Sequence, residues 1–577
     1  MRQKFILFLV PAVFFLVSIF TLKDYGISWD SPIHFRRGQS YLHYLTTGKM
    51  DYKDVSGKMS YFQSNIQNAS YFLQDDGGHP PVNGILSAVT NYVFFRQLNI
   101  LGDIEAYNLF IVITSSLLVL IVGLFAFGEY GIFAALSSQT ILALYPLFFA
   151  ESHFNIKDPP LAFFFGLTIY LIWLAIKRNK WWLMIAAGLS SGIALGIKFN
   201  ILFLPFIIVP YLFLEKRFFK NAKLVIAFLV IPVISFLILF ALWPYLWAGP
   251  GRLLSVFDYY KNIGTGTGYQ NNFLLPGGLN AFALFWITIT TPPVVLLLVL
   301  TGVLAIMRDR AKQKTGVLWL LWMIVPIVRI SLPNTTVYGG IRQIMEFVPA
   351  MALIAGVGAS RIVSGIKFPK AVFYVLILTV LSVPVVKLHP NQNVYFNSLI
   401  GGLHGAYTKN VPYWGNSFGN AYWQAVKWLN ENSESGARLA LIQGTMTNIP
   451  PVQLRSDIDF SNLNWSGIFR SGEYLLELTH NDPVKLYPYG WEYVENFLDP
   501  VYEVKVDGVA IAKLWKNDLE HTKTEFRKEE IKTTHIPLKD GRELRVDLGE
   551  EKIITRVYVG FTETGKCSGL RRQVVGG

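Results

Sequence analysis

The stretch Leu224–Leu242 reads LVIAFLVIPVISFLILFAL and contains no charged side chain. Its length is close to the roughly 20 residues that an α-helix needs to cross a bilayer. Pro292–Met307 and Ala371–Val386 also contain no charged side chain. The whole chain of 577 residues is 52% hydrophobic and 15% charged, which is atypical of a soluble enzyme. We therefore predict a polytopic α-helical membrane protein.

Short basic connections between the apolar runs predict the topology. By the positive-inside rule, each of these connections is expected in the cytoplasm. They are Lys177–Lys180, Lys216–Lys223, Arg308–Lys314 and Arg361–Lys370. About eleven spans with a cytoplasmic N-terminus and an exterior C-terminus satisfy all four assignments. The spans are expected near 5–22, 104–127, 130–149, 159–176, 181–198, 199–214, 224–247, 280–307, 316–332, 344–360 and 371–387.

Two N-proximal segments allow more than one interpretation. Met1–Lys4 followed by Phe5–Leu22 has the order of a secretory signal, but no small-residue cleavage site follows it. We interpret it as an uncleaved signal-anchor helix rather than a cleaved peptide. Polar residues interrupt Asn83–Leu101, so this segment is predicted to be an interfacial helix rather than a span.

The chain divides into three predicted parts. Residues 1–387 form the membrane domain, and charge rises after about residue 388, which indicates an exterior soluble α+β domain over 388–535. Within it Asn416–Asn430 is predicted to be a helix, and Ala437–Ile442 and Tyr502–Leu514 alternate like half-buried strands. Residues 536–577 form the third part, in which Glu543–Phe561 is predicted to be two strands around a turn at Gly549-Glu550.

Charge and cysteine content exclude several function classes. The net charge of +13 comes largely from the cytoplasmic connections, which is a topology signal rather than a nucleic-acid-binding face. The single cysteine, Cys567, rules out an intramolecular disulfide and a Cys-rich metal site. No metal-ligand spacing and no cofactor motif occurs, so we expect neither metal nor cofactor. An exterior domain without disulfides favours a bacterial inner membrane.

The predicted topology places several polar residues on the exterior side. Asp30 follows the first span, where a carboxylate could take the proton of an attacking hydroxyl. Its alternative role is to cap the helix that begins at Ser31-Pro32. His79-Pro80-Pro81 lies in the same loop, where the two prolines stiffen the wall of a site or simply form a turn.

A second exterior loop runs from Glu151 to Pro160 and contains His153, Asn155 and Asp158. Such polar density at a membrane boundary is costly unless the groups are paired or solvated. The alternative for Asp158 is again a helix cap, with Pro159 in the first turn.

Lys198 and Arg342 lie at predicted exterior helix ends, where cations could hold a lipid phosphate. Each residue also has an alternative, structural role. Lys198 could snorkel towards the lipid headgroups, and Arg342 could form an ion pair with Glu346, one helical turn further on.

Taken together these segments resemble the type C membrane glycosyltransferase superfamily, in the branch of protein O-mannosyltransferases and lipid A aminoarabinose transferases. The resemblance covers roughly residues 1–390. It rests on Trp29-Asp30, His79-Pro80-Pro81, Asn155-Ile156-Lys157-Asp158-Pro159, Gly196-Ile197-Lys198-Phe199, and Gly340-Ile341-Arg342 ahead of Pro349.

The resemblance implies a role for each matching position. Asp30 corresponds to the general base of the first loop and Asp158 to the acid of the second loop. Lys198 and Arg342 correspond to the residues that bind the donor phosphate. Ser31 and Gly339 depart from the pattern, because the family commonly has an acid at each position.

The tail also carries resemblances. Tyr395–Gly402, Tyr413–Asn416 and Trp428–Asn430 resemble the exterior tail of bacterial members of this branch. Val546–Gly549 with Ile554–Val557 resembles the opening of a discoidin-like carbohydrate-binding sandwich. This resemblance implies that residues 536–577 begin a β-sandwich that is too short to close.

The sequence therefore predicts a glycosyltransferase that moves a sugar, with inversion, from a polyprenyl-phosphate donor to a hydroxyl of a protein, lipid or glycan acceptor. The catalytic groups are Asp30 and Asp158, the phosphate is bound by Lys198 and Arg342, and His79, His153 and Asn155 form the site wall. Membrane lipids are expected partners, and nucleic acid is not. The alternatives are a transporter or flippase of lipid-linked sugars and a non-enzymatic glycan-binding membrane protein.

Overall fold

The structure is a computed structural model that describes residues 5–262, 273–309, 312–337, 339–366, 368–442, 446–479 and 488–526. Residues Met1–Lys523 form one compact unit, and Thr524–Gly577 form a second. The predicted β-sandwich over 536–577 lies outside the described residues.

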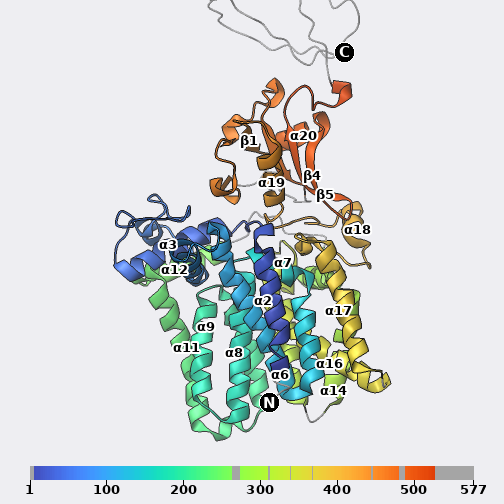
Figure 1. Ribbon diagram of the computed structural model, residues 1–577. Helices are drawn as coiled ribbons and strands as arrows, with labels where there is room; N and C mark the ends of the chain where they lie inside the picture. Colours follow the sequence, from blue (N-terminus) through green and yellow to red (C-terminus); the bar gives the residue numbers. More distant parts are fainter. Residues whose placement is uncertain are drawn as a thin grey trace, which may run out of the picture. The chain divides into compact units, whose positions relative to one another are not determined.

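The first unit contains a bundle of apolar helices, which lie side by side in Figure 1. They are α2 (Leu9–Thr21), α6 (Asp103–Ala143), α8 (Asp158–Arg178), α9 (Trp182–Leu195), α10 (Leu204–Leu214), α11 (Ala222–Leu242), α13 (Phe282–Thr290), α14 (Pro293–Arg308), α15 (Gln313–Ser331), α16 (Val348–Ile366) and α17 (Lys370–Lys387). Within the described ranges, six helices are long and apolar enough to cross a membrane, or up to seven if the bent pair α13 and α14 is one span. The predicted class of polytopic helical membrane protein is confirmed.

Glycine and proline break two of the long apolar stretches. Gly131, with φ of 82°, interrupts α6 and separates the two predicted spans 104–127 and 130–149. The predicted span 280–307 is not one straight helix, because α13 and α14 meet at 117° around Thr291 and Pro292. Proline removes a helical hydrogen bond and clashes with the preceding turn, which explains this break.

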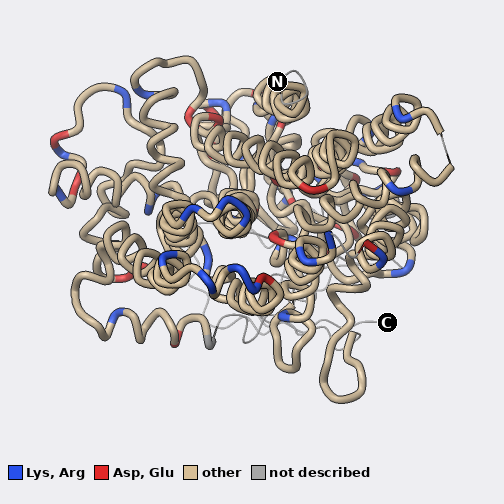
Figure 2. Tube along the Cα trace, turned by 90° about the horizontal axis from the view of Figure 1, so that it is seen from below, with Lys and Arg blue, Asp and Glu red and all other residues tan. Residues whose placement is uncertain are grey.

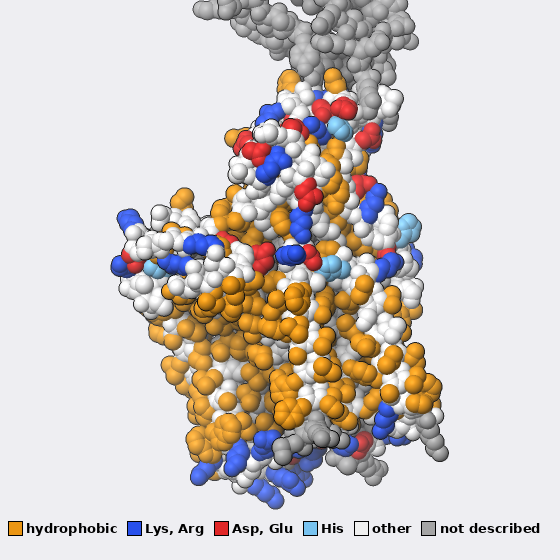
Figure 3. All heavy atoms as spheres, in the orientation of Figure 1, with side chains coloured by type: hydrophobic (Ala, Val, Ile, Leu, Met, Phe, Trp, Pro, Cys, Tyr) orange, Lys and Arg blue, Asp and Glu red, His pale blue; other side chains and the backbone are white. Residues whose placement is uncertain are grey.

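The surface of the bundle has the pattern of a membrane protein. Figure 3 shows a band of hydrophobic side chains around the helices, with Lys and Arg gathered below it. Figure 2, viewed from below, shows the basic residues at the helix ends on that side. The opposite end carries the shorter helices α3 (Ser31–Thr47), α5 (Val82–Asn91), α7 (Pro146–Phe154) and α12 (Gly251–Asn262), and we call it the site end.

The remaining short helices are α4 (Ala69–Gln74), α18 (Gly402–Thr408), α19 (Tyr422–Asn432) and α20 (Pro488–Phe497). The predicted helix 416–430 therefore begins six residues late, at Tyr422. Phe418 and Gly419 have φ of 56° and 95°, which are incompatible with a right-handed helix.

A five-stranded sheet in the order β2-β1-β3-β5-β4 confirms the predicted C-terminal α+β region. Its strands are β1 (Arg438–Leu441), β2 (Asp459–Phe460), β3 (Tyr474–Leu478), β4 (Pro500–Val506) and β5 (Val509–Lys516). β1 pairs in parallel with β2 and β3, whereas β5 runs antiparallel to β3 and β4. The predicted strand 502–514 is thus a hairpin that turns at Asp507 and Gly508.

Candidate active site

Asp30 lies at the site end, directly before α3. It occupies the N-cap position of this helix, but its side chain makes no capping hydrogen bond. Instead its carboxylate lies 2.7 Å from the Lys157 ammonium. The capping alternative for Asp30 is therefore wrong, and the first loop is joined to the loop between α7 and α8.

Asn155 organises that second loop. Its Nδ2 donates to Glu151, at 2.6 Å, and to Asp158, at 2.8 Å. Its Oδ1 accepts from the backbone N–H groups of Lys157 and Asp158. These bonds form an Asx turn directly before α8, which begins at Asp158. The turn fixes the directions in which the Lys157 and Asp158 side chains point. Lys157, rather than Asp158, occupies the N-cap position of α8, so the capping alternative for Asp158 is wrong as well.

Asp158 contacts both cations that are predicted to bind the phosphate. Lys198 Nζ donates to it at 2.8 Å, and Arg342 Nη1 lies 3.6 Å from its other oxygen. Asp158 is only 1% exposed, so its charge is compensated almost entirely by these partners. Lys198 does not snorkel away from the site. The structure thus brings together Asp30, Asn155, Asp158, Lys198 and Arg342.

The backbone carbonyl of Gln343, next to Arg342, accepts from three side chains. Lys198 Nζ, Asn200 Nδ2 and Arg329 Nη2 lie 3.3, 3.0 and 3.1 Å from it. Glu346 accepts from Asn200 at 2.9 Å and lies 3.5 Å from Arg329. Sequence reasoning missed Arg329 and Asn200, because neither belongs to a motif. They fix the turn that carries Arg342.

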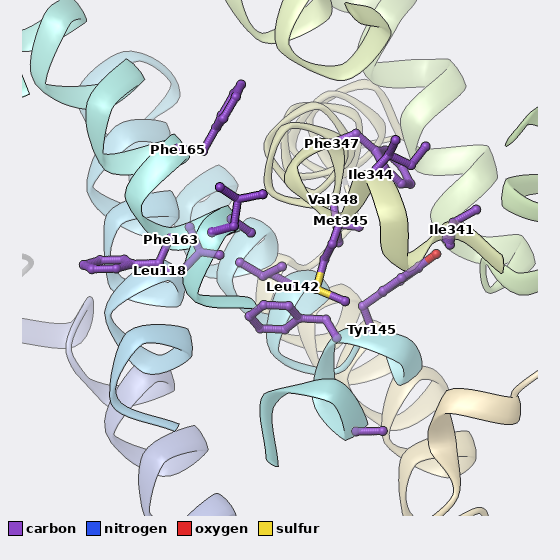
Figure 4. Close-up of a cluster of buried hydrophobic side chains, with 14 of the residues drawn as sticks. Leu118, Leu142, Tyr145, Phe163, Phe165, Ile341, Ile344, Met345, Phe347 and Val348 are labelled. Carbon is purple, nitrogen blue, oxygen red and sulfur yellow. The ribbon is translucent and has the colours of Figure 1, made fainter. Parts of the chain in front are cut away.

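The apolar side of this turn is buried in the bundle. The turn is η8 (Gly340–Phe347), a 3-10 helix that leads into α16. Figure 4 shows Ile341, Ile344 and Met345 among the hydrophobic side chains of the neighbouring helices, including Leu142 and Tyr145. Burial of these side chains holds η8 in place while Arg342 reaches Asp158.

His79 forms part of the wall near Asp30. Its Nε2 lies 2.7 Å from the Tyr259 hydroxyl, and its ring lies 5.7 Å from that of His34. Burial, reinforced by the nearby Lys157 charge, lowers the pKa of His79 to about 3. A neutral imidazole suits a site wall rather than a further cationic group.

His153 does not join this cluster. It faces the end of α2, where its Nε2 lies 3.1 Å from Thr21 Oγ1 and its ring stacks on Tyr25 at 4.0 Å. Ser31, at the position where the family commonly has an acid, is fully buried. Its hydroxyl contacts Ser28 and the carbonyl of Phe154, so it belongs to the packing beneath the site.

Two carboxyl groups of the site have opposite pKa shifts. Burial would raise the pKa of Asp30, but Lys157 and Arg342 outweigh it and hold this pKa well below its usual value. For Glu151 burial prevails and raises the pKa to about 8, despite the nearby Arg342. The two cations thus favour the ionised form of Asp30, whereas burial favours the protonated form of Glu151.

Two cavities share Tyr395 as a lining residue. The first lies beside the Arg342 turn and is lined by Gly339–Ile341, Trp286, Asn393 and Asn416, among others. The second has a volume of about 390 Å³ and lies between the start of α14 and the end of α17. Its walls are apolar except for the ion pair of Lys387 with Asp507. Within the described residues, no group of His, Cys, Asp and Glu side chains is arranged to hold a metal ion.

Comparison with known proteins gives this geometry a family context. Residues 89–242 match the family model of dolichyl-phosphate-mannose-protein mannosyltransferases. Over this part of its length the chain is similar to glycosyltransferases. The matched region includes Asn155, Asp158 and Lys198, whereas Asp30, His79 and Arg342 lie outside it. No curated protein sequence matches the chain significantly.

Two solved structures are also similar to the chain. ArnT from Cupriavidus metallidurans in the apo state is 13% identical, with 88% of this chain and 97% of that one covered and a TM-score of 0.46. The archaeal oligosaccharyltransferase AglB from Archaeoglobus fulgidus, in complex with an inhibitory peptide and a dolichol-phosphate, is also 13% identical. The match covers 82% of this chain and 70% of that one, with a TM-score of 0.45.

Proposed function

We propose that the chain transfers a sugar from a polyprenyl-phosphate donor to an acceptor hydroxyl, with inversion at the anomeric carbon. The observation that carries this proposal is the convergence of Lys198 and Arg342 on Asp158, beside the Asp30–Lys157 ion pair. The match to a family named for a dolichyl-phosphate sugar supports the choice of donor.

In this proposal Lys198 and Arg342 bind the phosphate that leaves the sugar. Negative charge on that phosphate grows as the bond to the anomeric carbon breaks, so fixed cations stabilise the transition state more than the ground state. Asp158 holds both cations in position before the donor arrives, and the contacts to the Gln343 carbonyl restrict the backbone beside Arg342.

Asp30 is proposed as the general base. It accepts the proton of the acceptor hydroxyl while the oxygen attacks the anomeric carbon and the polyprenyl phosphate departs. Lys157 keeps the carboxylate ionised, which the base needs before reaction. A carboxylate with a lowered pKa is a weak base, so proton transfer is expected late, when the attacking oxygen has already become acidic.

The polyprenyl chain is proposed to lie in the apolar groove between α14 and α17. This groove is open to the outside of the bundle, where Val383 is 58% exposed, and it shares Tyr395 with the cavity beside Arg342. A donor could therefore keep its chain in lipid while its phosphate reaches the cations.

We propose the bacterial inner membrane as the location, with a cytoplasmic N-terminus and the site end outside. Residues 1–387 form the catalytic membrane domain and 388–535 the exterior domain in this proposal. The proposed acceptor is a free hydroxyl group of a protein, a lipid or a glycan.

The decisive experiment incubates the purified protein with labelled polyprenyl-phosphate sugars and candidate acceptors. Transfer of label to a hydroxyl supports the enzyme. Movement of the intact donor across a vesicle membrane without transfer supports the flippase alternative. Binding of glycans with neither activity supports a non-enzymatic glycan-binding protein.

A further inference from the structure

Phe418 lies in the segment between the membrane bundle and the sheet, where the sequence predicts a helix. It is 2% exposed and has a left-handed backbone, with φ of 56°. A bulky side chain rarely adopts this conformation, which costs energy unless the surroundings enforce it. The Phe418 N–H donates to Asn416 Oδ1 at 2.9 Å, and this bond supports the turn.

The turn is attached to the loop that contains Asp30. The carbonyl of Phe418 accepts from the backbone N–H of Trp29, at 3.1 Å. Asn420 accepts from the N–H of Gly26, at 2.8 Å. Gly419 follows with φ of 95°, and a Cβ there would come within 2.9 Å of the Ile27 carbonyl and 2.8 Å of the Trp29 ring. The segment is thus fitted closely against the first loop.

The side chain of Phe418 reaches the other half of the site. The guanidinium carbon of Arg342 lies 3.6 Å from the centre of the Phe418 ring, which is a close cation–π contact. This contact occupies a face of the guanidinium, whereas its N–H groups point outward in its plane, where they can bind phosphate oxygens.

We propose that Phe418 is a positioning residue that orients Arg342 towards the donor phosphate and joins it to the Asp30 loop. This inference rests on the proposed function, because it assigns Arg342 to the donor phosphate. It makes a segment outside the membrane helices part of the active site. The strained backbone of Phe418 is explained by the need to present its ring to Arg342 while its carbonyl holds Trp29.

The test replaces Phe418 by fluorinated phenylalanines of nearly the same size, which weaken the attraction between ring and cation without emptying the core. The purified full chain in nanodiscs is assayed for binding of undecaprenyl phosphate. Affinity should fall progressively with fluorination, by about two- to thirtyfold in total. The matched control is Phe125, which is fully buried within the bundle and packs on Tyr170, Trp173 and Trp319. The same substitutions there should leave affinity unchanged.

A double-mutant cycle separates orientation of Arg342 from general packing. Phe418→Leu should weaken carrier binding in the unaltered protein but have little further effect in an Arg342→Gln background. Equal effects in both backgrounds, or affinity that does not respond to fluorination, would overturn the role of Phe418. If the unaltered protein does not bind undecaprenyl phosphate at all, the proposed function fails before Phe418 is tested.

Discussion

Lys198 and Asp158 lie 40 positions apart in the sequence and form an ion pair of 2.8 Å at the site end of the bundle. Asp158 begins α8, whereas Lys198 follows the end of α9, so this pair joins the same ends of two adjacent antiparallel helices. Arg342 comes from a third part of the chain, and its Nη1 lies 3.6 Å from the other carboxylate oxygen of Asp158. One buried carboxylate therefore fixes two cations at a position where a phosphate could bind both.

Replacing Lys198 or Arg342 by Ala should reduce transition-state stabilisation by about 2–4 kcal/mol, the usual effect of losing one preorganised donor to a developing anion. Transfer from a labelled donor gives this value as the change in kcat/KM. Arg342→Lys should restore activity only in part, because Lys lacks the planar fork. Unchanged specific activity with a lower protein yield would make both residues structural.

Asp30→Asn should leave a folded, donor-binding protein that turns over roughly 10²–10⁴ times more slowly. The amide cannot accept the proton of the acceptor, but it has nearly the shape of the carboxylate. Single-turnover transfer and donor binding are measured on the same preparation. Near-normal turnover would remove Asp30 from the mechanism and make Asp158 the next base to test.

Lys157→Gln should move the acidic limb of the pH–rate profile to higher pH. Activity requires ionised Asp30 and is lost as the pH falls through its pKa, which Lys157 holds below the usual carboxyl value. Without Lys157 this pKa rises, so protonation begins at a higher pH. The control is Lys53→Gln, between α3 and α4, with a side chain that is 83% exposed. A limb that moves equally in both variants would contradict the role of Lys157.

Val383→Trp should obstruct the groove between α14 and α17. KM for a long-chain donor should rise by about tenfold, the effect of losing contact with about two methylene groups. A short-chain donor should be used as before. Val233→Trp on α11 is the control, because Val233 is 57% exposed and does not line the groove. Equal KM changes in the two variants would place the chain elsewhere.

Reporter fusions after Lys180, Lys220 and Lys312 should indicate the cytoplasm, and fusions after residue 400 the exterior. These positions follow from the basic connections at one end of the bundle (Figure 3) and the sheet at the other (Figure 1). Alkaline phosphatase, which is active outside the cytoplasm, and a reporter that is active only in the cytoplasm are fused at the same sites, so that each result is checked by the other. A cytoplasmic C-terminal region would reverse the side on which every proposed site residue lies.

The sequence by itself determined the features that depend on local composition. Runs such as Leu224–Leu242 predict membrane helices, since no polar group along them could be satisfied in lipid except within a helix. Asp30, Asp158, Lys198 and Arg342 could be singled out because the predicted topology places all four on the exterior side, in segments that resemble the family's motifs. His153 was grouped with them only because it is close to Asp158 in sequence.

Only the tertiary structure decided which of these groups meet. Lys157 pairs with Asp30, and Arg329 and Asn200 hold the Gln343 carbonyl, because the packing of α8, α15 and η8 brings distant parts of the chain within hydrogen-bond distance. Phe418 was expected in a helix, but contacts with Trp29 and Arg342 outweigh its local preference. No periodicity or residue spacing in the sequence predicts such contacts, because they depend on how whole helices pack against one another.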